Sequence, residues 1–328
     1  MAIKYWMISN RNVSKEGLGA DRSSLSYWVS ETDGLDDFAK WGKVGGGTFI
    51  KSLAAVADTF PPAADLADHE DQKHVTLFVH GFNNDWKDAV RRYESLTGKL
   101  FGGNGGLGQC VLFTWPSDGM TLGYLPDRAD ARSSGEDLAD VLSDLFDWLL
   151  DKQEAGAADP AKACKAKTSL IAHSMGNYVL QNAMQVCWTR KNQPLLLSLI
   201  NQLLMVAADV DNDLFKSGEQ VDKGDGDAIA NLCYRITVLY SGLDSVLGLS
   251  AGMKHFGKRR LGRSGLDPTC LVPDNVWDVD CTPLIQPDTK GVHSIYFEKP
   301  KIIDLMREVL RGVDRTVLVG KGLAPGNS

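Results

Sequence analysis

A short apolar run that ends in a Ser between small residues is the feature that most constrains this chain. Residues 167–173 (KTSLIAH) have the pattern of a buried strand, and apolar residues recur at helical spacing over residues 179–187. Between them, residues 172–176 (AHSMG) place small side chains two positions before and after Ser174. A sharp turn from a strand into a helix needs small residues there, because larger side chains would clash. The segment therefore predicts a strand, a tight turn with Ser174 at its tip, and a helix.

Ser174 in such a turn is a candidate nucleophile. A hydroxyl is a weak nucleophile, so a Ser that attacks an acyl carbon must stand on a corner, close to a base and to amides that hold an oxyanion. A second segment, residues 248–252 (GLSAG), fits the G-x-S-x-G pattern by its letters. No strand leads directly into it, since the nearest strand-like run ends at Tyr240, so we expect Ser250 to lie in a loop or turn. Ser174 is the preferred nucleophile.

Composition and charge exclude several classes of protein. The 328 residues carry a formal net charge of -7, which argues against nucleic acid as the main partner. No uninterrupted apolar run approaches the roughly 20 residues of a membrane span. Residues 1–9 lack the pattern of a signal peptide and predict a first strand. We therefore expect a cytoplasmic protein without a membrane span, in which the basic stretch 258–263 is a solvated loop.

Neither a metal nor a cofactor is expected. The six Cys show no C-x-x-C spacing and no grouping with His, although Cys270 and Cys281 could pair in an oxidising compartment. Residues 102–108 (GGNGGLG) contain G-x-G-x-x-G. A dinucleotide fingerprint must follow a strand and open a helix, whereas this stretch ends a predicted helix and precedes a predicted strand. We interpret it as a turn.

Strand-like and helix-like segments alternate through the middle of the chain. Buried strands are predicted at 74–79, 110–114, 167–173, 203–208, 235–240 and 275–281. Helices are predicted after Asp85, from a cap at Ser134, and over residues 300–311, closed by Gly312. This alternation predicts an α/β fold with a mostly parallel central sheet, wound on both faces by helices.

The predicted organisation is a single domain over residues 1–328. Its core spans residues 75–310. Residues 1–60 add an N-terminal extension of short strands and loops, with strands at 3–8 and 25–29 and a third candidate strand at 48–53. Residues 313–328 form a tail.

Candidate catalytic residues follow the predicted strands, where ligands bind in parallel α/β sheets. An attacking Ser174 needs an imidazole base and a carboxylate that fixes the imidazole tautomer. The chain order Ser, acid, His favours His293, in a predicted loop, over His255, which follows Asp244 closely inside a basic stretch. Asp244 is the preferred acid. Asp209, at another strand end, remains the alternative acid, and would otherwise cap a helix or brace the loops.

Backbone amides should complete the site by holding the oxyanion. Met175 follows the nucleophile at the start of a helix and is the expected first donor, and Phe82, after the strand that ends near residue 79, is the expected second. Gly81 lets the backbone turn close to a substrate. The residues expected to support these loops are His80, Gly81, Asn83 and His173.

Several short motifs fall in a fixed order along the chain. They are HGFNN at 80–84, FTWPS at 113–117, AHSMGN at 172–177, AADVDNDLF at 207–215 and GVHS at 291–294. With the strand end at Asp244, this series resembles a branch of bacterial α/β-hydrolases of unknown function, over residues 75–310. The resemblance implies the α/β-hydrolase fold, a triad of Ser174, Asp244 and His293, and an esterase-like or lipase-like activity. It does not supply a substrate.

The function expected from these features is that of a serine hydrolase. It would cleave a small-molecule carboxylic ester through an acyl-enzyme on Ser174, with thioesters and amides as further options. Acyl transfer by the same residues is one alternative, and a non-catalytic binding protein on the same fold is another. The sequence makes no prediction about the oligomeric state.

Overall fold

The computed structural model describes residues 4–62, 65–66, 68–82, 84–103, 105–117, 124–189, 200–216, 225–254, 257–286 and 289–325. The chain divides into two compact units, Met1–Ser169 and Leu170–Ser328. The single domain expected from sequence stays a prediction. Strands alternate with helices, and most strand pairs are parallel, so the predicted α/β fold with a mostly parallel sheet is confirmed.

In the first unit, the N-terminal strands form one end of the sheet. The spatial order is β3 (Gly42–Val44), β2 (Gly17–Ser30), β1 (Tyr5–Ser14), β5 (Gly108–Thr114) and β4 (His74–Val79). The β1–β2 and β2–β3 pairs are antiparallel, whereas β1–β5 and β4–β5 are parallel. The hairpin of β1 and β2 is the predicted N-terminal extension. Because β1, β5 and β4 run parallel, the loops that follow them leave the same edge of the sheet.

The helices of the first unit correct two sequence predictions. They are α1 (Gly46–Ala57), α2 (Trp86–Leu96) and α3 (Tyr124–Ala158). Residues 48–53 are not a strand but part of α1, because Phe49, Leu53 and Ala57 recur at every fourth residue, which is a helical spacing. Ser134 is not a helix cap: it lies inside α3, and its hydroxyl accepts a hydrogen bond from Asn10 (2.9 Å).

One capping prediction for the first unit is confirmed. The Asp85 carboxylate accepts a hydrogen bond from the Asp88 amide at the start of α2 (2.8 Å). Shorter helical turns lie at Phe38–Lys40, His69–Asp71, Thr97–Phe101 and Pro160–Lys162.

In the second unit, parallel strands bring several loops to one edge. The strand order is β6 (Lys167–His173), β7 (Ile200–Val206), β8 (Cys233–Tyr240) and β9 (Val276–Asp280). The β7–β8 and β8–β9 pairs are parallel. Beyond β6, the Ser174 amide donates to the Val206 carbonyl (3.0 Å), so the turn after β6 is fixed to the end of β7. Ser174, Asp209 and Asp244 therefore each follow a strand at this edge.

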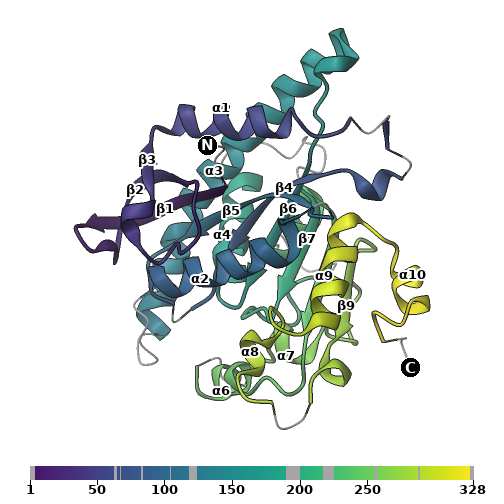
Figure 1. Cartoon of the computed structure of the whole chain (residues 1–328). Coiled ribbons are helices and arrows are strands. Elements are labelled where there is room, and N and C mark those ends of the chain that lie inside the picture. Colours follow the sequence, from purple (N-terminus) through teal and green to yellow (C-terminus); the bar gives the residue numbers. More distant parts are fainter. Residues whose placement is uncertain are drawn as a thin grey trace. The chain divides into compact units, whose positions relative to one another are not determined.

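The helices of the second unit connect and cover these strands. They are α4 (Gly176–Thr189), α5 (Asp225–Leu232), α6 (Ser245–Lys254), α7 (Leu261–Ser264), α8 (Val292–Ile295), α9 (Pro300–Arg311) and α10 (Arg315–Gly320), with a 3-10 turn at Thr282–Leu284. Helix α9 packs on β7 (Figure 1). It ends at Gly312, whose φ of 90° is left-handed, so the predicted helix and its closure are confirmed.

Two other predictions for the second unit are wrong in detail. Ser250 lies in α6 and not in a loop, because α6 begins directly after Asp244, which caps it. His293 lies in the one-turn helix α8, which the left-handed Gly291 (φ 68°) introduces. Residues 313–328, the predicted tail, include α10, whose first turn is capped by Asp314, and their assignment as a tail stays a prediction.

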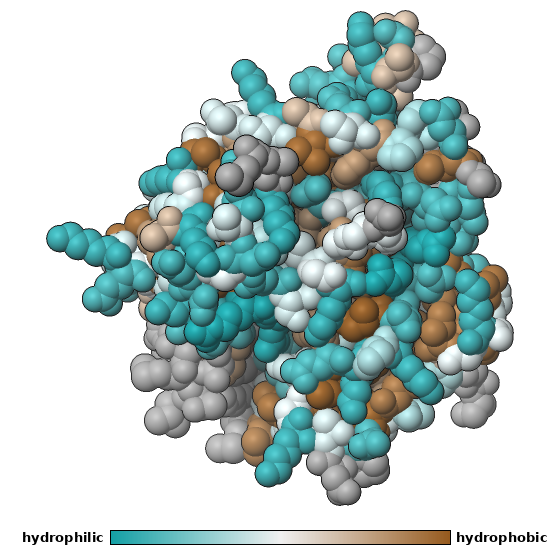
Figure 2. Space-filling view, in the orientation of Figure 1, coloured by the Kyte–Doolittle hydropathy of each residue, from teal (hydrophilic) through white to brown (hydrophobic). Residues whose placement is uncertain are grey.

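The surface carries few large apolar side chains. The face in Figure 2 is mostly hydrophilic, with small separate apolar patches. Exposed apolar residues of the second unit include Val246, Leu249 and Leu271. Among the helices that the structure describes, none combines the length and the apolar character that crossing a membrane requires. All six Cys are free thiols, so Cys270 and Cys281 are not paired here.

Candidate active site

The backbone at Ser174, the candidate nucleophile, is strained. Its φ of 52° is left-handed, which is rare for a residue with a side chain. The Ser174 carbonyl accepts hydrogen bonds from the Asn177 amide (3.1 Å), the Asn177 side chain (3.1 Å) and the Asp209 amide (3.1 Å). The same Asn177 side chain donates to the Ala172 carbonyl (2.9 Å). Asn177 thus ties the end of β6 to the turn and holds the strained residue in place.

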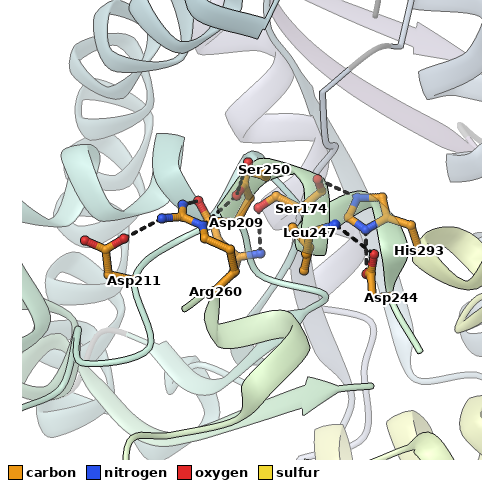
Figure 3. Close-up of polar contacts among 9 residues, drawn as sticks. Ser174, Asp209, Asp211, Asp244, Leu247, Ser250, Arg260 and His293 are labelled. Carbon is orange, nitrogen blue, oxygen red and sulfur yellow. Dashed lines mark hydrogen bonds and ion pairs between the residues drawn. The ribbon is translucent and has the colours of Figure 1, made fainter. Parts of the chain in front are cut away.

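His293 contacts both Ser174 and Asp244 with its ring (Figure 3). The Ser174 hydroxyl lies 2.7 Å from His293 Nε2, and His293 Nδ1 lies 2.7 Å from Asp244 Oδ2. A proton on Nδ1, donated to the carboxylate, leaves Nε2 free to accept the proton of the hydroxyl. Three residues far apart in the sequence therefore form one hydrogen-bonded series in the second unit.

Asp244 is fully buried and held from two directions. Its Oδ1 accepts the Leu247 amide (3.0 Å) at the start of α6, while its Oδ2 faces His293. The Leu247 amide lies in the first turn of α6, so the Asp244 carboxylate caps this helix. The position therefore suits a carboxylate that orients an imidazole.

Asp209 has different partners. Its Oδ1 accepts hydrogen bonds from Arg260 Nε (2.8 Å) and from the Ser250 hydroxyl (3.1 Å) (Figure 3). The His293 ring nitrogens contact Ser174 and Asp244 and not Asp209, so this geometry favours Asp244 as the acid. The expectation that the 258–263 stretch is a solvated loop is wrong at Arg260, whose side chain is 0% exposed and paired with Asp209.

His173, the residue before the nucleophile, contacts the segment that carries the base. Its Nε2 lies 2.9 Å from the His293 carbonyl and donates a proton to it. The His173 ring packs against the His293 ring (5.0 Å between centroids) and edge-on against Phe297 (5.2 Å). His173 therefore contacts the backbone of α8, and its role in supporting the site stays a prediction.

Met175 is the one expected oxyanion donor in the second unit. It is buried directly before α4, and among the described residues no hydrogen-bond acceptor takes up its amide. That amide is available to an oxyanion at the amino terminus of α4. Phe82 belongs to the first unit, and its role as second donor stays a prediction. Asn83 and His255 lie outside the described residues.

His80 supports the loop after β4 within the first unit. It is fully buried, its Nδ1 donates to the Gly81 carbonyl (2.8 Å), and its Nε2 accepts the Trp115 amide (3.2 Å). The His80 and Trp115 rings stack 5.4 Å apart. Burial, with a smaller effect of the nearby Arg11 charge, lowers the pKa of His80 to about 3. The imidazole is therefore neutral and links the loops after β4 and β5.

Arg11 is a supporting residue that sequence reasoning missed. Its side chain is buried at the end of β1 and donates to the carbonyls of Asn84 (2.9 Å) and Ser117 (3.3 Å) and to the Thr114 hydroxyl (3.0 Å). The N-terminal extension thereby holds the loops after β4 and β5. The first strand predicted from sequence covers residues 3–8, so Arg11 lay beyond it, and only the longer β1 of the structure includes this arginine.

No metal site emerges within the described ranges, where no group of three or more His, Cys, Asp or Glu side chains is placed to hold an ion. The expectation that neither metal nor cofactor takes part stays a prediction.

Comparison with known families decides the relationship. Residues 62–308 match the model of a family described as "Alpha/beta hydrolase of unknown function (DUF900)". The chain belongs to this family. The motifs quoted from the sequence thus identified the right group of α/β-hydrolases. A relative with the same extent is an uncharacterized protein, alr1448, of Nostoc sp., which is 23% identical and matches over 94% of each chain.

Several solved structures to which this chain is similar are lipases or esterases. Aspergillus fumigatus lipase B has a TM-score of 0.38 at 11% identity, over 86% of this chain and 63% of that chain. Phospholipase PlaB from Legionella pneumophila has a TM-score of 0.36 at 14% identity, over 72% and 60%. Carboxyl esterase 2 from Tuber melanosporum has a TM-score of 0.36 at 12% identity, over 93% and 90%. The chain thus spans less than two thirds of the first two proteins.

Proposed function

We propose that this protein is a serine hydrolase that cleaves a carboxylic ester through an acyl-enzyme on Ser174. The observation that carries the proposal is the hydrogen-bonded series from the Ser174 hydroxyl through His293 to Asp244, with 2.7 Å at each step. A buried Ser at a strained turn, next to an imidazole whose other nitrogen meets a carboxylate, is the arrangement that activates a hydroxyl for attack. Membership of an α/β-hydrolase family supports the same chemistry.

In the proposed mechanism, His293 moves a proton while Ser174 attacks the ester carbonyl. His293 Nε2 takes the hydroxyl proton, and Asp244 stabilises the imidazolium that results. The amides of Met175 and Phe82 are the proposed donors to the oxyanion. His293 then gives its proton to the leaving alcohol, and the acyl group stays on Ser174. Water, activated by the same imidazole, releases the acid and restores the enzyme.

The proposed substrate class is a small carboxylic ester, with thioesters and amides as chemically related options. The acyl-enzyme can also pass its acyl group to an alcohol or amine in place of water. Product analysis with added acceptors separates hydrolysis from transfer, because transfer gives a new ester or amide and hydrolysis gives the free acid.

A panel of esters of different acyl length tests the proposal. Ser174→Ala and His293→Ala should each lower kcat by about 10⁴-fold or more, and Asp244→Asn should lower it by about 10⁴-fold. Ser52→Ala, in α1, is the matched control and should keep full activity. Turnover of the panel that survives in Ser174→Ala would refute the assignment of the nucleophile.

A further inference from the structure

A four-residue segment, Arg260–Arg263, lies against the loop that follows β7. We call it the clasp. The Arg260 side chain donates to the carboxylate and the carbonyl of Asp209. The backbone of the clasp adds two bonds, from the Leu261 amide to the Val210 carbonyl (2.9 Å) and from the Gly262 amide to the Ala208 carbonyl (2.9 Å). The Asp209 amide donates a hydrogen bond to the Ser174 carbonyl, so Asp209 connects the clasp to the turn at Ser174.

The same segment holds the loop that follows β8. The Ser241 amide donates to the Gly262 carbonyl (3.1 Å). The Arg263 guanidinium donates to the carbonyl of Asp244, the residue whose carboxylate meets His293. The clasp therefore spans two loops, of which one contacts the nucleophile and the other carries the acid.

Two glycines make this fit possible. A Cβ on Gly262 would lie 2.1 Å from the Ala207 carbonyl carbon, so the clasp approaches the β7 loop as closely as only glycine allows. A Cβ on Gly248 would lie 2.9 Å from Arg263 Nη1, so a glycine lets the arginine cross α6 on its way to Asp244. The absence of a side chain at Gly262 and Gly248 therefore leaves room for the clasp beside the loop after β7 and for Arg263 beside α6.

The second G-x-S-x-G match of the sequence has its explanation here. Gly248 leaves space for the Arg263 guanidinium, and the Ser250 hydroxyl donates a hydrogen bond to Asp209 (3.1 Å). Ser250 therefore lies beside Asp209, which Arg260 of the clasp also contacts (Figure 3), and the segment 248–252 connects α6 to the clasp and to the loop after β7.

We propose that Arg263 is a positioning residue that sets the triad acid relative to the nucleophile, by holding the Asp244 backbone through the clasp. This inference rests on the proposed serine hydrolase function. A displacement of about 1 Å in a catalytic group costs about 100-fold in rate, so a bond that fixes the backbone of the acid matters although Arg263 touches no reacting atom. Arg263 is half-buried, and its loss leaves no buried charge unpaired.

A double-mutant cycle separates positioning from a general structural role. The measured quantity is the rate at which a fluorophosphonate probe labels Ser174, which requires no knowledge of the substrate. Arg263→Met in the wild-type background should slow labelling by about 10-fold to 100-fold. In the Asp244→Asn background, Arg263→Met should lower the labelling rate by less than about threefold, because the effects of two residues that act through one another are not additive. Arg311→Met, on α9, is the matched arginine control.

Gly248→Ala provides a second test that keeps every charge. Alanine is the better helix former, so α6 should fold, while the new methyl group displaces the Arg263 guanidinium. Labelling should slow by about threefold to tenfold at an unchanged Tm. Gly320→Ala, in α10, where a Cβ meets no atom, is the matched glycine control and should label at the wild-type rate.

The outcomes separate the two proposals. If wild-type protein labels at Ser174 but Arg263→Met costs the same factor in both backgrounds, the positioning role is wrong and the hydrolase proposal stands. Wild-type rates in both Arg263→Met and Gly248→Ala would overturn the role as well. If folded wild-type protein is not labelled at all, the proposed function itself fails.

Discussion

Acidification from pH 7 to pH 5 should destabilise this protein through two buried histidines of the first unit. His74 and His80 are both fully buried, and burial is the main reason that the pKa of each falls to about 3. In the unfolded chain each imidazole regains its ordinary pKa of about 6.5. Below pH 6.5 the unfolded state therefore binds protons that the native state does not bind. The free energy of unfolding consequently decreases as the pH is lowered.

The magnitude follows from the two pKa values. Each pH unit below 6.5 costs about 1.4 kcal/mol for each histidine, until the native pKa of about 3 is reached. Between pH 7 and pH 5 this amounts to about 2 kcal/mol for each imidazole, and about 4 kcal/mol for both. The free energy of unfolding of a typical protein is about 5 to 15 kcal/mol, so a loss of this size should be easy to measure.

Urea unfolding at pH 7, 6 and 5 is the assay, applied to wild type and to His74→Gln and His80→Gln. Each variant will differ in stability at pH 7, and the informative quantity is the change from pH 7 to pH 5. That change should be about 2 kcal/mol smaller in each variant than in the wild type. An identical pH dependence in all three proteins would refute the argument, because it would mean that both imidazoles take up protons in the native state.

Three further substitutions probe the surroundings of the candidate nucleophile. Ser174→Gly should raise the free energy of unfolding by about 1 kcal/mol while activity is lost, because glycine adopts the left-handed φ of 52° without strain, and a decrease in urea unfolding would contradict this. Asn177→Ala should cost about 1 to 3 kcal/mol, measured in the same way, because two carbonyls at the turn lose their donor, and an unchanged midpoint would count against the brace. Arg260→Met should cost about 3 to 5 kcal/mol because it removes the buried cation that pairs with the Asp209 carboxylate, and adding Asp209→Asn should recover part of that loss. A double variant no more stable than the single one would be evidence against the pair.

The candidate nucleophile, base and acid were predicted from local pattern and chain order, and their catalytic roles stay predictions. The apolar strand, the small residues around Ser174 and the helical spacing after it are local signals. Asp244 and His293 were ranked by their places in the chain. The structure then brings the three side chains together. Both Asp244 and Asp209 follow a strand, so the sequence preferred Asp244 and left Asp209 open; the contact of His293 with Asp244 favours the same choice, and the role of the acid stays a prediction.

Other features depended on tertiary contacts that no local pattern records. Arg260 sits in a basic run that resembles a solvated loop, yet Asp209, far away in the sequence, draws it into the interior. Arg11 is a cation in a strand, and its partners are carbonyls of distant loops. Residues 48–53 are apolar and β-branched enough to suit a strand, but α1 forms because its apolar residues recur at helical spacing. In each case, contacts made in the folded protein, and not the local sequence pattern, determine the structure.

Intact-mass labelling with a fluorophosphonate tests the central claim most directly. The probe reacts only with an activated serine, so wild type, Ser174→Ala and His293→Ala should be compared after the same exposure. We expect a single adduct on the wild type, none on Ser174→Ala and almost none on His293→Ala, because the proposed activation of the hydroxyl runs through His293 Nε2, 2.7 Å away. An adduct that persists on Ser174→Ala, or folded wild-type protein that takes up none, would contradict it.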